Sequence, residues 1–514
     1  MSIIKANGAG DQSLGFYNGV ATQSLRLDGG TEITLDNAGA ATSNKIATIS
    51  VWFKRADELT TLAYLFHSKN DGSFGDGSNG LASFSITLDA DDTISVVQYN
   101  GNPSFNANQY DFGVQIQNRK FRDMGSWYHL VVAIDTTQGS GTTNEADRIK
   151  MYVNGTQQTV VAISDGSGYQ DFADENQLVA VNQDGEQRWG GTVDDGTYAH
   201  VYLAEINVVD GLQLTPSNFG QTKNGVWIAK NPSVSEYGNH GYRLQFKETG
   251  VGAGASDTVG ADTSGKNNHF TTHSNIAAHD CNMPDSPENN FATINSLHRD
   301  ASAYSSTTTS EGNLSFKHSN LAHASAIATM ALPKSGKWYW ETLNNSSATN
   351  GTNTVGVVVS TYTNSNALSG AGSYFWQNGF GIYGNNGSNF GTAPSVTWDT
   401  SGSATTFTAN DIIGVAYDAD NKDVEWYKNG VKIDYNVTDF DDDGNDLIPA
   451  SSAYGNPANA GIVFNFGSDS SFAGNKTAQG NTDGNGIGDF YYAPPSGHLA
   501  LCSANLPEPT ISPN

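Results

Sequence analysis

The chain is poor in cysteine, with only Cys281 and Cys502 among its 514 residues. These two lie far apart in the sequence and fit neither a zinc-binding nor a redox-active spacing. We therefore expect two free, partly buried thiols, and a disulfide between them is an open alternative. The sequence gives no sign of cysteine-based metal or redox chemistry.

Basic residues are also scarce. Lys and Arg number 25 against 52 Asp and Glu, which gives a formal net charge of −27. A surface of this sign repels DNA, RNA and anionic membranes, so we expect no nucleic-acid partner. Charged residues of both signs make up only 15% of the chain, against about a quarter in an average domain. Gly, Ser, Thr and Asn take their place.

Long apolar runs are missing. No stretch approaches the ~20 residues of a membrane span. Residues 1–10 lack both the basic start and the apolar run of a secretory signal. We expect a soluble protein without membrane insertion, made in the cytoplasm, which reaches the outside of a cell only on a particle or by lysis.

Aromatic residues and glycine are abundant, with 22 Tyr, 23 Phe, 9 Trp and 57 Gly. This mixture is typical of β-strands joined by tight turns. Short runs of alternating polarity occur throughout, and no long segment has a helical period with caps. An all-β fold is predicted, with the clearest strands at residues 25–27, 33–35, 49–53, 84–88, 127–135, 201–209, 338–343, 354–359, 380–383, 411–418 and 462–466.

One strand pattern occurs twice. An apolar strand ends at Asp135, and the next strand turns at Asn154-Gly155; in the second half, Asp418 and Asn429-Gly430 take the same places. Asn-Gly supplies the positive φ angles of a tight hairpin turn. The shared order predicts two antiparallel β-sandwiches of related topology. The expected organisation is an arm at 1–14, a sandwich at 15–230, a connector at 231–295, a sandwich at 296–470, and a loop and tail at 471–514.

The motifs in these strands resemble two known domain families. The first half, over residues 15–230, resembles a LamG-type concanavalin A-like domain through ISVWFKR (49–55), WYHLVVAID (127–135) and MYVNG (151–155). The second half, over residues 296–467, resembles a SPRY domain through GKWYWE (336–341), VGVVV (355–359), GFGIY (379–383), DIIGVAYD (411–418), VEWYKNG (424–430) and VFNFG (463–467). The resemblance implies two concanavalin A-like jelly-roll sandwiches in tandem.

Other segments resemble a family of phage proteins with this same arrangement. They are residues 242–246, 262–268, 285–291 and the tail at 494–511. The resemblance implies a structural protein on the virion surface of a tailed phage, with other virion proteins as partners. We also expect self-association, as a homo-oligomer, or docking through the connector and the tail, with the tail extended over a sandwich or a neighbouring chain.

Three functions remain open. The favoured hypothesis is a tail-fibre or receptor-binding component that recognises a host surface glycan or protein. The alternative is a capsid decoration or tail adaptor protein that binds only virion neighbours. The third, a glycan-cleaving enzyme, needs two carboxylates ~5–9 Å apart in one cleft. Strand 201–209 offers only Glu205, with Asn207 where the second acid would lie, and Glu341 is alone in strand 338–343. No nucleophile elbow, zinc motif or phosphate loop occurs, so we expect no catalysis.

Two loops have the spacing of calcium sites, which makes calcium the one predicted cofactor. The first places oxygen ligands at Asp439, Asp441, Asp443 and Asn445, but Ala450 stands where the closing acid belongs. The second resembles a thrombospondin-type calcium repeat and offers Asn481, Asp483, Asn485 and Asp489. The alternative for both is an ordinary turn in which Asp and Asn bond their own backbone.

Aromatic residues in Gly/Ser/Asn-rich segments are the remaining candidates for ligand binding, because an exposed ring can stack on a sugar or anchor a partner. They are Tyr374, Phe375, Trp376 and Phe390. Core packing is the alternative for each of them. The tryptophans within predicted strands are expected in the core: Trp52, Trp127, Trp338 and Trp426.

Overall fold

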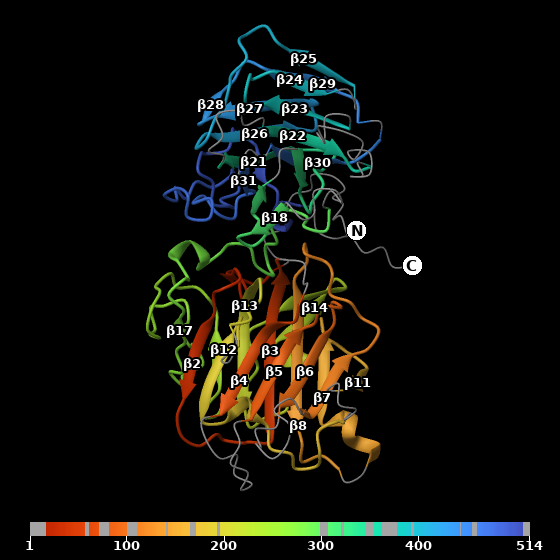
Figure 1. Cartoon of the computed structure of the whole chain (residues 1–514), viewed down its shortest axis with the longest axis vertical. Coiled ribbons are helices and arrows are strands. Elements are labelled where there is room, and N and C mark those ends of the chain that lie inside the picture. The colour runs from red at the N-terminus through yellow and green to blue at the C-terminus, as the bar shows by residue number, and fades with distance from the viewer. Residues whose placement is uncertain are drawn as a thin grey trace. The chain divides into compact units, whose positions relative to one another are not determined.

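The computed structural model divides the chain into two compact units. The first unit comprises Tyr17–Arg122 and Ser126–Glu288, and the second comprises Asn289–Thr510 with Asp123–Gly125. We call them the first and second domains (Figure 1). The structure describes residues 17–56, 61–70, 82–99, 110–139, 142–164, 171–192, 196–298, 307–319, 323–345, 353–361, 378–391, 395–442, 444–454 and 460–506.

The first domain is a sandwich of two antiparallel sheets with an added hairpin. One sheet has the order β1-β13-β3-β8-β9-β10, with β16 beside β13: β1 Leu25–Leu27, β3 Ile46–Arg55, β8 Tyr128–Asp135, β9 Ile149–Val153, β10 Thr156–Gln157, β13 Val201–Asp210 and β16 Tyr242–Leu244. The other has the order β11-β7-β6-β5-β4-β12-β2-β17: β2 Ile33–Asn37, β4 Ala63–Asn70, β5 Ser83–Leu88, β6 Ile94–Tyr99, β7 Tyr110–Ile116, β11 Val160–Ala162, β12 Gly185–Trp189 and β17 Thr271–Thr272. The hairpin is β14 Gly220–Lys223 and β15 Val226–Ala229.

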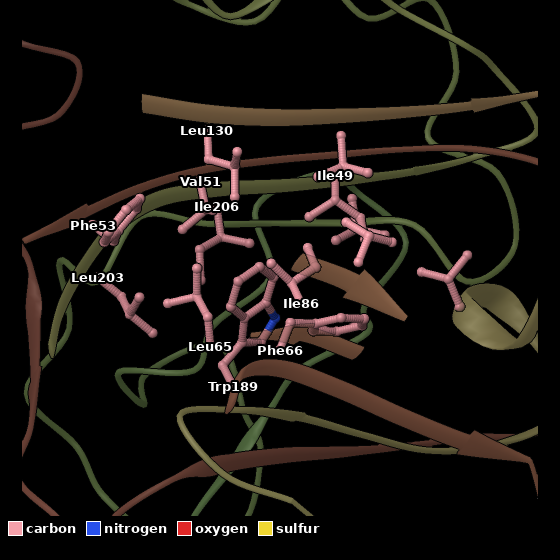
Figure 2. Packing of buried hydrophobic residues seen from close by; sticks show 14 of the residues in the cluster. Ile49, Val51, Phe53, Leu65, Phe66, Ile86, Leu130, Trp189, Leu203 and Ile206 are labelled. Carbon is pink, nitrogen blue, oxygen red and sulfur yellow. The ribbon is translucent and has the colours of Figure 1, made fainter. Parts of the chain in front are cut away.

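Apolar side chains from alternate strand positions fill the space between these sheets. Figure 2 shows Val51 of β3 and Leu203 of β13 facing Leu65 of β4 and Trp189 of β12. The indole of Trp189 donates a 2.9 Å hydrogen bond to the hydroxyl of Tyr242, which satisfies the one polar group of this large side chain. Alternating polarity therefore places one apolar face of each sheet in a shared core.

Residues 231–288, predicted as a connector, pack on the first domain. Buried ion pairs fasten their last part: Arg26 binds Asp280 at 2.9 Å, and Lys54 binds Asp285 at 2.8 Å. The carboxylate of Glu288 also accepts the backbone N–H groups of residues 19–21. This segment thus belongs to the domain that precedes it.

The second domain is also built from two antiparallel sheets. The larger has the order β18-β19-β31-β21-β26-β27-β29-β25, with β28 beside β27 and β32 beside β21: β18 Thr307–Ser310, β19 Ser315–His318, β21 Lys337–Asn344, β25 Val396–Asp399, β26 Ile412–Asp418, β27 Asp423–Lys428, β28 Val431–Lys432, β29 Asn436–Phe440, β31 Ala460–Asn465 and β32 Leu499–Ala500. The smaller has the order β20-β30-β22-β23-β24: β20 His323–Ile327, β22 Thr354–Val359, β23 Gly379–Tyr383, β24 Asn389–Gly391 and β30 Leu447–Tyr454.

The predicted all-β fold with two sandwiches is confirmed. Among the described residues the helices are single 3₁₀ turns or little more: Thr142–Asp147, Ala180–Asn182, Pro216–Asn218, Ala278–Asp280 and Ser503–Asn505. None of these helices is long or apolar enough to span a membrane. The four strand tryptophans, Trp52, Trp127, Trp338 and Trp426, are buried as predicted.

The duplicated turn is the same in both domains. Asn154 and Asn429 both have positive φ, near 48° and 49°, and each precedes a glycine that does too. The Asn154 side chain accepts the backbone N–H of His129, the second residue of β8, at 2.8 Å. Asn429 accepts the N–H of Ile412, the first residue of β26, at 2.9 Å. The asparagine therefore both makes the turn and ties it to the neighbouring strand.

The segment after β31 covers the outer face of the larger sheet in the second domain. It contributes Phe490, Ala500 and Cys502 to a small apolar cluster with Phe291 and Tyr339. Strand β32 pairs with β21 in parallel, unlike the antiparallel pairs of the rest of the sheet. The C-terminal region up to residue 506 is thus an integral layer of the second domain.

Candidate functional site

Hydroxyl side chains cover the outer face of the eight-stranded sheet in the first domain. In β5, Phe84, Ile86 and Leu88 point into the core, so the alternating Ser83, Ser85 and Thr87 point to the opposite face. The neighbouring β6 repeats the pattern, with Ser95, Val97 and Tyr99 on that face. These side chains are nonetheless largely shielded from solvent: Ser85 is 0%, Ser95 1% and Thr87 3% exposed.

A hollow of about 260 Å³ lies on this face. Its floor comes from β5, β6 and β7, and its rim from the chain before β4 and after β11. The described residues that line it are Leu62, Thr87, Asp89, Ser95, Val97, Tyr99, Gln115, Ile163 and Ser164. None of these is a lysine or an arginine, and apolar and polar groups alternate around the wall.

The carboxylate of Asp89 organises the polar half of the hollow. It accepts hydrogen bonds from the hydroxyls of Thr87 and Ser95 and from the side-chain amide of Gln115, at 3.1 Å for the amide. The Thr93 hydroxyl lies 3.2 Å from the same carboxylate, but its single proton goes to Asp91 at 2.5 Å. Three donors, from β5, β6 and β7, thus converge on the carboxylate of Asp89.

The predicted aromatic residues do not form a described site. Tyr374, Phe375 and Trp376 lie outside the described residues. Phe390, in β24, is 8% exposed and packs in the core of the second domain, 4.8 Å between ring centroids from Tyr383. For Phe390 the structure therefore supports the core-packing alternative.

A lysine side chain of the protein, Lys334, pairs with the first acidic loop. Asp439 belongs to strand β29, and Asp443 lies outside the described residues. The ammonium group of Lys334 lies 2.7 Å from a carboxylate oxygen of Asp442 and also bonds the backbone carbonyl of Asn445. This ion pair holds the pKa of Asp442 below its usual value, although burial acts in the opposite direction.

In the second loop the predicted ligands bond to the protein itself. Both oxygens of Asp483 are occupied: one accepts the N–H groups of Asn485 and Ile487, and the other accepts Ala500 N–H and the Asn505 amide at 2.7 Å. The side chain of Asn481 donates to the Tyr491 carbonyl, and Asp489 caps the backbone of Ser470 and Gly480. These contacts fasten the C-terminal region to the domain.

Calcium therefore remains a proposal for these loops, with a small expected effect. Weak binding at ten times the dissociation constant would stabilise the fold by about 1.4 kcal/mol. Because Lys334 competes for the first loop, Lys334→Met should enlarge the rise in melting temperature that calcium produces over a chelator. Lys317→Met, on the exposed side of β19, is the matched control. Equal melting in calcium and chelator for both the parent and Lys334→Met would refute calcium binding.

Glu205 does not stand opposite a second acid. It lies at a bulge in β13 with a strained positive φ near 45°, and its carboxylate binds the guanidinium of Arg243 at 2.6 Å. Burial raises the pKa of Glu205 to about 7, against the opposing effect of Arg243. Asn207, in the expected partner position, accepts the hydroxyl of Tyr237. The arrangement is an ion pair, not the carboxylate pair of a glycosidase.

Glu341 is likewise hydrogen-bonded to other groups of the protein. Its fully buried carboxylate accepts the backbone N–H groups of Tyr491 and Tyr492 at 2.9 and 2.8 Å, and the Asn465 amide at 3.1 Å. Burial raises the pKa of this carboxyl to about 7, although these hydrogen bonds act to lower it. Glu341 thus anchors the C-terminal region on β21.

The raised pKa of Glu341 predicts a pH effect on stability. Below pH 4.5 the group is protonated in both states; between pH 4.5 and 7 only the unfolded chain loses the proton, so stability falls as pH rises. A shift of this size is worth on the order of 3 kcal/mol. Glu341→Gln should flatten this part of the melting profile of the second domain. Glu425→Gln, whose pKa is lowered mainly by Lys432 against the effect of burial, is the control. Parallel profiles for the parent and Glu341→Gln would contradict the assignment.

A buried Ser–His contact in the first domain has the wrong polarity for a nucleophile. His129 lies between the rings of Trp52 and Trp227, and burial lowers its pKa to about 3. The Trp227 indole donates to Nδ1 at 2.9 Å, so the neutral ring carries its proton on Nε2 and donates it to Ser50 Oγ. The imidazole therefore cannot accept the hydroxyl proton of Ser50, as a general base must.

Sequence reasoning missed the hollow. The predicted strands include 84–88, but β4, β6 and β7 were not predicted. No prediction could therefore place the outward residues of these strands on one face of a sheet. The available signal was the sequence SFSITL at 83–88, in which hydroxyl residues alternate with large apolar ones and continue at Ser95 in the next strand. Such alternation indicates a strand with one apolar face in the core and one polar face.

Two domain families match the chain. Residues 27–198 match the model of the concanavalin A-like lectin/glucanases superfamily, Laminin_G_3, and residues 337–469 match that of the SPRY domain. No curated protein matches the chain significantly.

Three solved structures illustrate the structural similarity. Mouse laminin alpha1 domains LG4-5 share 8% identity, with a TM-score of 0.28, over 88% of this chain and 86% of theirs. The human HERC1 SPRY domain shares 14%, with a TM-score of 0.26, over 34% and 97%. The Ruminococcus gnavus IT-sialidase CBM40 shares 14%, with a TM-score of 0.24, over 35% and 85%. At these values nothing about ligands follows from the similarity. The two family matches, together with the two sandwiches, identify the chain as a LamG-like, concanavalin A-like domain followed by a SPRY domain.

Proposed function

We propose that this protein is a non-enzymatic binding protein on the virion surface of a tailed phage, which recognises a host surface saccharide through the hollow of its first domain. The observation that carries the proposal is the preorganised polar wall around Asp89, next to the apolar groups of Val97 and Tyr99. Saccharides present both hydroxyl groups and apolar C–H faces, and a wall of this mixed character complements both.

Two further observations support binding without catalysis. Glu205 and Glu341 are both held by partners in the folded protein, at Arg243 and at the N–H groups of Tyr491 and Tyr492.

The placement on a phage virion rests on the sequence resemblance of residues 242–246, 262–268, 285–291 and 494–511 to phage proteins. Other virion proteins and a second copy of the chain are the proposed neighbours.

An array of bacterial surface saccharides, probed with the purified protein, tests the proposal. We expect binding to a subset of saccharides, and loss of that binding in Val97→Phe, which fills the hollow without removing a hydrogen bond. Val226→Phe, in the hairpin β14–β15, is a control of the same chemistry outside the hollow. Release of a cleaved product from a bound saccharide would contradict the non-enzymatic assignment.

Virions of the phage supply the second part of the test. Antibody labelling should place the protein on the particle surface, and the soluble protein should compete with virions for adsorption to host cells. Capture of virion proteins with no bound saccharide would instead favour the decoration or adaptor alternative.

A further inference from the structure

Two hydroxyl groups in the hollow have their protons directed at one carboxylate. Thr87 donates its hydroxyl proton to one oxygen of Asp89 at 2.9 Å, and Ser95 donates to the other. A hydroxyl has one proton to donate and two lone pairs that accept. Both hydroxyls therefore present only lone pairs to anything else that enters the hollow.

The amide of Gln115 has the same polarity. Its Nε2 carries two protons and lies 2.7 Å from the Thr93 hydroxyl, 3.1 Å from Asp89 and 3.3 Å from Ser95, so these acceptors take up both protons. The three contacts orient the amide nitrogen towards Asp89, so the acceptor Oε1 lies on the other side of the group. Among the described hydrogen bonds of this residue, none occupies that oxygen. Thr87, Ser95 and Gln115 thus present acceptors next to the negative charge of Asp89.

A wall of acceptors discriminates between ligands. A ligand hydroxyl can donate to each of these oxygens, whereas a carboxylate, sulfate or phosphate brings only further acceptors and a negative charge. A buried polar group left without a partner costs more than a good hydrogen bond gains. Among the described residues that line the hollow there is no lysine or arginine, and the net charge of the chain, −27, acts in the same direction.

The apolar part of the wall favours an uncharged sugar ring. Leu62, Val97 and Ile163 line the hollow together with the ring of Tyr99, and such groups pack against the C–H face of a pyranose. The volume, about 260 Å³, is below the ~300–1,000 Å³ of pockets that enclose a drug-sized ligand. The space therefore fits a short saccharide segment and not a long chain.

We propose that the hollow selects uncharged, hydroxyl-rich saccharides and rejects acidic ones. This inference rests on the proposed saccharide-binding function and specifies its ligand class. Asp89 is the residue that sets the selectivity, because it directs the protons of Thr87, Ser95 and Gln115 away from the ligand.

Calorimetric titration of the full chain with matched saccharides tests the selectivity. Each pair consists of a neutral hexose oligosaccharide and its uronic-acid counterpart, which differ only in a CH₂OH or carboxylate group at C6. We expect the neutral member of each binding pair to bind at least about tenfold more tightly at pH 7 and low salt. This comparison needs no variant, so it does not depend on how well a variant folds.

Asp89→Asn adds a second comparison. The amide supplies two N–H donors and frees the hydroxyl protons of Thr87 and Ser95, so the preference for the neutral member should fall to near unity. Asp135→Asn is the matched control, because Asp135 also accepts a threonine hydroxyl and a glutamine amide, from Thr137 and Gln138, at a turn outside the hollow.

The outcomes separate the two proposals. Equal or tighter binding of the uronic acids, or an unchanged preference in Asp89→Asn, would overturn the selectivity while saccharide binding stands. Absence of binding by every saccharide at millimolar concentration would overturn the proposed function and, with it, the ligand class.

Discussion

Truncation of the chain after Ala493 is expected to abolish the cooperative unfolding transition of the second domain and to leave that of the first domain unchanged. The missing part contains β32 and the fully buried side chains of Ala500, Leu501 and Cys502. Each large apolar side chain that is fully buried contributes about 1.5–3 kcal/mol. A domain is stable by only about 5–15 kcal/mol in total, so this loss, taken together with the hydrogen bonds that truncation breaks, approaches its whole stability.

Lost hydrogen bonds add to this effect. Ala500 N–H and the Asn505 amide occupy one oxygen of Asp483, so truncation leaves a buried carboxylate without two of its donors. The Ala292 N–H loses its acceptor, the carbonyl of Leu501. An unpartnered buried polar group costs about 1–3 kcal/mol, more when it is charged.

Scanning calorimetry of the intact chain and of two truncated chains provides the measurement. Truncation after Leu506 is the matched control, because it keeps β32 and its contacts. Single substitutions refine the result: Leu501→Ala should cost about 2–5 kcal/mol, and Leu499→Ala less, because Leu499 is only half-buried. Two unchanged transitions after truncation at Ala493 would show that this segment is not part of the second domain.

Replacement of Asp285 by asparagine is expected to destabilise the first domain by about 3–5 kcal/mol. Lys54 and Asp285 are bonded at 2.8 Å with both side chains fully buried. The substitution preserves the size of the side chain and an acceptor for the Trp127 indole, which bonds Asp285 at 3.1 Å. It removes only the charge, so the buried ammonium group of Lys54 loses the carboxylate that lies 2.8 Å away. At about 2–4 °C per kcal/mol for a domain of this size, the melting temperature should fall by roughly 10 °C.

An exposed pair of the same residue types provides the control. Lys120 and Asp91 are bonded at 2.7 Å, but their side chains are 41% and 59% exposed. Asp91→Asn should cost no more than about 1 kcal/mol. The double variant Lys54→Met, Asp285→Asn should recover much of the loss, because neither partner is then charged. If Asp285→Asn melts like Asp91→Asn, the buried pair does not fasten residues 280–288 to the domain.

Much of the fold was predictable because its strands follow simple alternation. The predicted strand 49–53 lies inside β3, 201–209 inside β13, and 462–466 overlaps β31. The two Asn-Gly turns were predictable down to their backbone angles, since few residues tolerate positive φ at both turn positions. The interior strand β4 and the edge strand β25 were missed, because polar residues interrupt the alternation of their sequences.

Packing against distant residues was not predictable. Residues 231–288 lack periodicity, yet their place is fixed by Arg26 and Lys54, which lie more than two hundred positions earlier. Position 450, where a calcium-binding acid was sought, lies within strand β30. Local spacing indicates which residues can bond, whereas the three-dimensional neighbours decide whether those bonds go to an ion or to the protein itself.

The candidate site shows the same limit. Asp89, Ser95 and Gln115 come from three segments that only the sheet register brings together. The predicted acidic residues Asp483 and Asp489 proved to bond to the second domain itself. A ligand-binding face is a property of several strands at once, and a single sequence reveals the register between strands only weakly.

The late position of β32 has a consequence for synthesis in the cell. All described strands of the first domain end by Thr272, so the ribosome can deliver a domain ready to fold while the second is still unfinished. The central strand β21 must wait for β26, β31 and then Leu499–Ala500 before its neighbours are complete. Until then its tryptophans and its unpaired edges are open to other nascent chains. We therefore expect the second domain to depend more on chaperones during translation than the first.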